Sequence, residues 1–328
     1  MRFERLFCFL VNLEAVMLLS LVFSFRNEEQ NIPELVRRVT VAVGSVPDVQ
    51  HEMIFVNDDS SDESLDTLLR LQEVHPIKII NMSRRFGVTP CVLAGFAHAK
   101  GDAVVYMDTD LQDPPELIPQ LVERFRGGAD VVHTTRTHRD GEGAVKMWLT
   151  KMAYKIINRF SDIPLPENTG DFKLLSRRAV EEILKFGEYD PYMRGLSIWV
   201  GFKQEFILYR RERRYTGRTK FPLFSKGPVR EFVRGLTSFS AVPLYLSFYV
   251  GLATSLLAMA LIIFAVVTKV LGVAAPGTSS VLIAVAFFSG IVLMTNGIIG
   301  IYIARIYQEV KGRPRYIIKN IIESKIKS

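Results

Sequence analysis

Short apolar runs alternate with stretches of helical periodicity over the first two hundred residues of the chain. The apolar runs end in polar residues, as buried strands do, and the stretches between them repeat their apolar positions every three to four residues. The strand–helix pairs are residues 16–25 with 32–43, 52–56 with 65–74, 77–82 with 90–99 and 103–107 with 115–125, followed by a strand at 130–134. This alternation predicts an α/β fold with a mainly parallel sheet and helices on both faces.

The last third of the chain has a different pattern. Residues 235–268 and 270–304 contain no charged side chain, and Lys269 is the single charge between them. A transmembrane helix needs about 20 apolar residues, and the turn residues at 273–280 separate the two runs. The sequence therefore predicts a hairpin of two transmembrane helices. Two buried helices of a soluble core are the alternative, which is disfavoured because such helices carry a polar face.

The charge distribution orients this hairpin. Residues 206–235 carry nine basic and two acidic side chains, and residues 305–328 carry seven basic and two acidic ones. By the positive-inside rule both flanks lie in the cytoplasm, together with both termini and the α/β domain. The formal net charge of +7 therefore conceals a charge of −6 in residues 1–205. We expect a multi-pass protein of the inner, cytoplasmic membrane whose partners are lipids rather than nucleic acid.

These patterns divide the chain into five segments. We expect an N-terminal extension at 1–17, an α/β domain at 18–205, a basic juxtamembrane segment at 206–238, two transmembrane helices within 239–307 and a basic cytoplasmic tail at 308–328. The two cysteines, Cys8 and Cys91, indicate no disulfide framework and favour a reducing compartment. The segments are compatible with a monomer or a homo-oligomer.

The sharpest polar cluster is Tyr106-Met-Asp-Thr-Asp-Leu-Gln-Asp-Pro-Pro-Glu116, which follows a predicted strand. Ligands of parallel sheets bind at the carboxyl ends of the strands. In an extended segment alternate residues face the same side, so Asp108, Asp110 and Gln112 are expected to project together. Converging oxygen ligands suit Mg²⁺ or Mn²⁺, which would bridge to phosphate oxygens.

Two further acidic clusters follow strands nearer the N-terminus. Asp58 belongs to Asn57-Asp-Asp-Ser-Ser-Asp62, whose carboxylates could accept hydrogen bonds from a nucleotide base or ribose, while its serines could cap the following helix. Asn27 and Glu28 follow the first strand, where Glu28 could contact the nucleotide or complement a helix dipole.

In this order and spacing, the three clusters resemble the inverting family 2 glycosyltransferases with a GT-A fold. Five further segments are similar to the polyprenyl-phosphate branch of that family, which includes dolichol-phosphate mannose synthases and bactoprenol glucosyltransferases. They are Ser83-Arg-Arg-Phe-Gly87, Ala94-Gly-Phe-Ala-His-Ala-Lys-Gly-Asp102, Asp110-Leu-Gln-Asp-Pro-Pro-Glu116, Gly170-Asp-Phe-Lys-Leu-Leu-Ser-Arg177 and Gly217-x-Thr-Lys-Phe221. The chain departs from the pattern at Asp59, where the family usually has glycine, and such a position favours residues that tolerate a left-handed backbone.

The resemblance implies transfer of a hexose from a UDP- or GDP-sugar to polyprenyl phosphate, for cell-surface glycan assembly such as O-antigen or cell-wall modification. Asn27, Glu28, Asp58 and Asp108 would then bind the nucleotide sugar, and Asp108, Asp110 and Gln112 would hold Mg²⁺ or Mn²⁺.

Catalysis would involve Asp110, Asp171 and Arg136. Asp171 would orient a sugar hydroxyl or the acceptor, or it could simply cap a helix. Arg136 would meet the acceptor phosphate, and Arg218 and Lys220 would bind the lipid phosphate.

Two other functions remain open from the sequence. One is a processive polysaccharide synthase of the same fold, although such enzymes use a Gln-x-x-Arg-Trp segment that is absent here. The other is a catalytically inactive, membrane-tethered binding subunit, against which the retention of Asp108, Asp110 and Gln112 argues.

Overall fold

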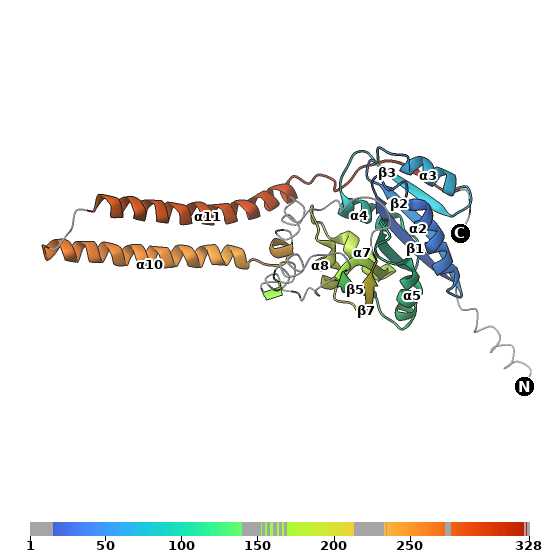
Figure 1. The fold of residues 1–328 in the computed structure, drawn as a ribbon, viewed down its shortest axis with the longest axis horizontal. Helices are drawn as coiled ribbons and strands as arrows, with labels where there is room; N and C mark the ends of the chain where they lie inside the picture. The colour runs from blue at the N-terminus through green and yellow to red at the C-terminus, as the bar shows by residue number, and fades with distance from the viewer. Residues whose placement is uncertain are drawn as a thin grey trace, which may run out of the picture.

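The computed structural model describes residues 16–139, 169–212, 235–272 and 277–324, with single residues at 152, 155, 158, 159, 163, 166, 233 and 326. The expected extension at residues 1–17 lies almost wholly outside them. Within the described residues an eight-stranded sheet has the order β7-β5-β6-β4-β1-β2-β3-β8 (Figure 1). The strands are β1 (Met17–Phe25), β2 (Val49–Asn57), β3 (Ile77–Met82), β4 (Ala103–Asp108), β5 (Val131–Arg139), β6 (Thr169–Ser176), β7 (Gln204–Arg211) and β8 (Ile318–Ile322).

Helices cover both faces of this sheet. They are α2 (Ile32–Gly44), α3 (Ser64–Leu71), α4 (Val88–His98), α5 (Ile118–Arg126), which follows the short 3-10 helix η1 (Pro115–Leu117), α7 (Arg177–Lys185) and α8 (Met193–Trp199). One core lies between the sheet and α2, α3 and α5, and the other lies between the sheet and α4, α7 and α8. The α/β fold predicted from the sequence is confirmed.

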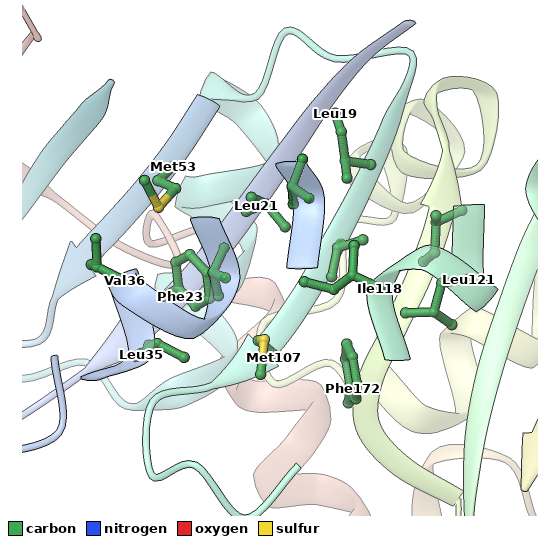
Figure 2. Packing of buried hydrophobic residues seen from close by; sticks show 14 of the residues in the cluster. Leu19, Leu21, Phe23, Leu35, Val36, Met53, Met107, Ile118, Leu121 and Phe172 are labelled. Atoms are coloured by element: carbon green, nitrogen blue, oxygen red, sulfur yellow. The ribbon is translucent and has the colours of Figure 1, made fainter. Parts of the chain in front are cut away.

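Strand periodicity separates the two cores. Alternate residues of β1 face α2 and α5, and Figure 2 shows this packing for Leu19, Leu21, Phe23, Leu35, Val36, Ile118 and Leu121. On the other face, Val22 meets α4 at Gly95, where an added Cβ would lie 2.3 Å from Val22 Cγ1. Only glycine lets the helix approach the strand this closely.

The sheet is parallel in its centre and mixed at its sides. Strands β1, β2, β3 and β4 run parallel, as expected, and β5 pairs parallel with β7. The pairs β3–β8, β4–β6 and β5–β6 are antiparallel. The strands β6, β7 and β8 were not predicted from the sequence.

Two long apolar helices, α10 (Val242–Val270) and α11 (Thr278–Val310), lie side by side and project away from the sheet (Figure 1). The mean hydropathy is 2.6 for residues 242–270 and 2.0 for residues 283–310, and neither window packs inside the protein. Their length and composition are those of membrane-crossing helices. Because α11 leads into β8, which pairs with β3, the chain returns from the hairpin to the sheet.

Candidate active site

The carboxyl ends of the central strands bring the predicted acidic residues together. Phe25 at the end of β1 pairs with Asn57 of β2, and Ser24 pairs with Asp108 at the end of β4. On the other side of β4, the antiparallel strand β6 places Lys173 opposite Tyr106. Continuing this register by two residues brings Asp171 to Asp108. The residues after β1 and β2 therefore share one edge of the sheet with both aspartates.

The electrostatic environment of Asp108 is dominated by burial and by other acids. Burial and the neighbouring carboxylates of Asp171, Asp110 and Asp113 raise its pKa, and the charge of Arg136 offsets this only in part. The Tyr106 hydroxyl donates to Asp108 Oδ1 at 3.2 Å. An acid in such surroundings is stabilised by an added cation.

The environment of Asp171 has the opposite effect on its carboxylate from that of Asp108. Although burial acts to raise it, the pKa of Asp171 is held below its usual range by Arg194. The Arg194 guanidinium donates from Nε to Oδ1 at 3.0 Å and from Nη2 to Oδ2 at 2.6 Å, a bidentate ion pair. Since Asp171 lies within β6, the alternative that it caps a helix is wrong.

The segment after β4 turns immediately, contrary to the expectation of an extended Asp108–Gln112. The strand ends at Asp108, and Leu111 has a φ of +57°. The backbone N–H of Gln112 donates to Asp110 Oδ1 at 3.1 Å, which closes the turn. Strand alternation therefore does not align Asp108, Asp110 and Gln112.

The acidic edge can nevertheless accept a divalent cation. Among the described residues no group of three or more Asp, Glu, His or Cys side chains converges into a complete metal site. Mg²⁺ is usually held by only one or two carboxylates together with substrate phosphates. Asp108, whose pKa is raised by burial and by the nearby carboxylates of Asp171 and Asp110, fits such a donor set of one or two carboxylates. Assignment of the metal to Asp108, Asp110 and Gln112 stays a prediction.

Arg136 of β5 is almost completely buried beside this edge, with a 9% exposed side chain. Its Nε donates to the Tyr209 hydroxyl at 2.9 Å, and its Nη2 lies 3.3 Å from Asp113 Oδ2. The Tyr209 hydroxyl also donates to Asp113. A Cβ on Gly170 would lie 3.0 Å from Arg136 Nη2, so glycine makes room for the guanidinium. Arg136 thus secures the segment after β4, and its contact with an acceptor phosphate stays a prediction.

Asp58 is buried where the segment after β2 meets the segment before α4. Its Oδ1 accepts from the Phe86 N–H at 2.6 Å and its Oδ2 accepts from the Gly87 N–H at 3.0 Å. The neighbouring Asp59 has a φ of +58°, the left-handed conformation expected at a position where the family usually has glycine.

The segment after β1 is tied to the segment after β2. Asn27 Oδ1 accepts from the Ser61 N–H at 2.9 Å, and the Asn27 N–H donates to Ser60 Oγ at 3.1 Å. Glu28 is buried and its Oε2 accepts from Asn31 Nδ2 at 2.5 Å, next to the start of α2. Asn27, Glu28 and Asp58 therefore lie together at the β1–β2 part of the edge, and their contact with a nucleotide stays a prediction.

Arg218 and Lys220 lie outside the described residues. Four residues that contact the site were not singled out from the sequence, namely Asp113, Lys173, Arg194 and Tyr209. Asp113 stands in the quoted acidic motif, but no role was assigned to it there. Arg194 is separated from Asp171 by a helix and a loop, and no local spacing indicates their pairing.

Comparison with known proteins identifies the family. Residues 20–184 match the family model described as glycosyl transferase family 2. An uncharacterized glycosyltransferase of Synechocystis sp. is 41% identical over 92% of this chain and 95% of its own length. A bactoprenol glucosyl transferase of Shigella phage SfII is 37% identical over 92% of this chain and 98% of its own length.

A solved structure of glucosyl-3-phosphoglycerate synthase from Mycobacterium tuberculosis, in complex with Mn²⁺, uridine diphosphate and phosphoglyceric acid, is also similar. It is 19% identical, covers 69% of this chain and 79% of its own, and gives a TM-score of 0.49. The match to the family model and the identity with relatives over nearly the whole chain establish that the chain belongs to glycosyltransferase family 2 and is a glycosyltransferase.

Proposed function

We propose that the protein transfers a hexose, with inversion, from a UDP- or GDP-hexose to a polyprenyl phosphate at the cytoplasmic face of the membrane. The observation that carries the proposal is the position of the acidic edge in a domain connected at both ends to a hairpin of two apolar helices. A relative of similar length is named a bactoprenol glucosyl transferase, which supports this acceptor.

The acidic edge suits the donor. A nucleotide diphosphate leaves the anomeric carbon as an anion, and Asp108 and Asp110 by themselves would repel it. Mg²⁺ or Mn²⁺, held by Asp108 and Asp110 with help from Gln112, would supply neutralisation of the diphosphate when bound. Asn27, Glu28 and Asp58 would hold the nucleoside end, since they form the neighbouring part of the same edge.

An ionised acceptor is compatible with an Asp171 carboxylate that is paired with Arg194 and does not act as a base. A phosphate monoester has a second pKa of about 6, so its oxygen is already an anion at neutral pH. That oxygen attacks the anomeric carbon while the bond to the diphosphate breaks, and no proton needs to be removed. Asp171, whose carboxylate is occupied by Arg194, suits orientation of a sugar hydroxyl rather than proton abstraction.

The acceptor phosphate requires cations near the membrane. Arg218 and Lys220 lie between the α/β domain and the hairpin in the sequence, which supports a role in binding the lipid phosphate. The basic residues on both sides of the hairpin favour a cytoplasmic α/β domain. The product would serve glycan assembly at the cell surface.

Transfer of labelled sugar to undecaprenyl phosphate tests the proposal. Membranes containing the full-length protein are incubated with a panel of UDP- and GDP-hexoses, with Mn²⁺ or with chelator. We expect lipid-linked product that requires the metal and is abolished by Asp110→Ala, while Glu181→Gln, an exposed change on α7, has no effect. Undiminished transfer by Asp110→Ala would contradict the mechanism. If none of the UDP- or GDP-hexoses in the panel yields lipid-linked product, the proposed function is wrong.

A further inference from the structure

Helix α8 carries two of the polar groups that surround Asp171 and Lys173. Arg194 forms the bidentate ion pair with Asp171, and Ser197 Oγ accepts from Lys173 Nζ at 2.9 Å. Residues three apart lie on the same face of a helix, so Arg194 and Ser197 together direct one face of α8 to β6. Lys173 is 2% exposed, so its ammonium group is shielded from solvent at this contact.

The neighbouring residue on α8 contacts the segment that leads into the hairpin. A Cβ on Gly195 would lie 2.0 Å from Cε2 and 2.5 Å from Cζ of Phe239. The Phe239 ring therefore occupies the space that any larger residue at position 195 would need. Phe239 is buried, and its ring meets that of Tyr192 edge-to-face with centroids 6.4 Å apart.

The position of Phe239 is in turn fixed by helix α11. On one side of it, Ser238 Oγ accepts from Arg305 Nη1 at 3.2 Å. On the other side, the carbonyl of Ser240 accepts from the Tyr302 hydroxyl at 2.8 Å. Both donors lie on α11, three residues apart and within the last three turns of the helix.

A second contact fastens the same end of α11 to the chain just before α8. Glu309 Oε1 accepts from the Tyr189 N–H at 2.8 Å. In Figure 1, α8 lies on the side of the α/β domain from which the hairpin projects. The contacts thus run without interruption from α11 through residues 238–240 to α8, and from α8 to Asp171.

We propose that α8 is a positioning element through which the docked hairpin sets the geometry of Asp171, with Arg194 as the positioning residue and the Phe239–Gly195 contact as the link to the hairpin. The inference rests on the proposed function in so far as Asp171 orients a reacting group. It goes further in assigning the hairpin a part in catalysis in addition to its part in anchoring.

The first test separates positioning from stability. Arg194→Gln is compared with Arg194→Lys and with Arg178→Gln, which breaks the ion pair of Arg178 with Asp130 at the start of α7. We expect Arg194→Gln to lower kcat at least tenfold with an unchanged KM for the nucleotide sugar, because the nucleotide side of the site belongs to β1 and β2. Arg194→Lys should recover part of kcat, and Arg178→Gln should stay within twofold of the wild type.

The second test exploits the fit of Phe239 against Gly195. Gly195→Ala adds the methyl group that the ring excludes, and we expect at least a fivefold loss in kcat. In the double variant Gly195→Ala/Phe239→Leu the smaller side chain makes room, so kcat should return to within threefold of Phe239→Leu alone. Gly187→Ala is the matched control, because a Cβ there meets nothing within 4 Å.

Two results would overturn the inference. The first is a kcat for Arg194→Gln that equals the kcat of Arg178→Gln. The second is a loss of kcat in Gly195→Ala/Phe239→Leu that equals the combined losses of the two single variants. Thermal unfolding of every variant shows whether a loss of kcat follows a loss of folded protein. If the wild type does not glycosylate polyprenyl phosphate, the proposed acceptor is wrong. The same variants are then compared by hydrolysis of the donor, where equal rates for Arg194→Gln and Arg178→Gln overturn the role of α8.

Discussion

Replacement of Asp58 by alanine should damage the nucleotide side of the site through the backbone that this carboxylate holds. Asp58 accepts hydrogen bonds from the N–H groups of Phe86 and Gly87, and the latter immediately precedes helix α4. Removal of the carboxylate leaves both amides without this acceptor and takes a negative charge from the N-terminus of a helix. The segment that joins β3 to α4 would then lose its fixed position against β2.

The size of the effect follows from these contacts. A hydrogen bond that involves a charged group contributes about 1.5–3 kcal/mol, and the two amides share three contacts with one carboxylate. We expect a loss of about 3 kcal/mol in the free energy of unfolding. For a domain of 150–250 residues this corresponds to a decrease in Tm of roughly 6–12 °C. Asp58→Asn keeps one acceptor oxygen and should lose less than half as much.

Thermal unfolding and donor kinetics of the full-length protein in detergent provide the assay. Asp102→Ala is the matched control, because Asp102 also accepts from a backbone N–H, that of Leu18 at 2.8 Å, but at the opposite end of the sheet. We expect Asp58→Ala to raise the KM for the nucleotide sugar more than tenfold and Asp102→Ala to leave it unchanged. Equal stability and equal KM for Asp58→Ala and the wild type would refute the reasoning.

Three further changes have expected outcomes. Asp59→Gly relieves a φ of +58° and should leave Tm equal or higher, whereas Asp59→Val should lower Tm, because a β-branched residue is strained there by at least about 1 kcal/mol; both are read by thermal unfolding. Gly95→Ala should destabilise the protein, since its Cβ would lie 2.3 Å from Val22 Cγ1, and the yield of folded protein together with Tm will show it. Burial lowers the pKa of Lys173 from 10.5 to about 8, so the unfolded chain binds more protons between these values and stability should rise with pH in that window. Lys173→Met should remove this rise, as measured by Tm between pH 7.5 and 10.5.

The sequence predicted the first half of the fold because its strands and helices bury regular apolar faces. Strand β6 escaped prediction because Asp171 and Lys173 interrupt its apolar pattern, although Lys173 is buried in the sheet. Strands β7 and β8 lie in basic stretches, and β8 pairs with β3 from a position more than 230 residues later in the chain. No local periodicity encodes such a pairing.

The candidate site could be predicted as a location but not as a set of contacts. The acidic residues after β1, β2 and β4 were identified because parallel strands end at a common edge. The turn at Leu111 was missed, since an apolar side chain with a positive φ contradicts the usual preference. The partners of Arg136 and Asp171 come from β7 and α8, whose positions depend on the unpredicted half of the sheet.

Asp108 and Asp171, the two aspartates at the end of the sheet, differ in the groups that surround them. Asp171 is neutralised by the guanidinium of Arg194, and a carboxylate engaged at both oxygens is a poor ligand for a metal ion. Asp108 receives only a tyrosine hydroxyl among the contacts described above, and three carboxylates raise its pKa after burial has done so. Under the proposed function, Mg²⁺ or Mn²⁺ would therefore be held on the side of Asp108 and Asp110 rather than by Asp171. In the proposed mechanism, the ion pair with Arg194 would keep Asp171 out of the metal site, and replacement of Arg194 by Gln should allow the cation to contact Asp171 as well.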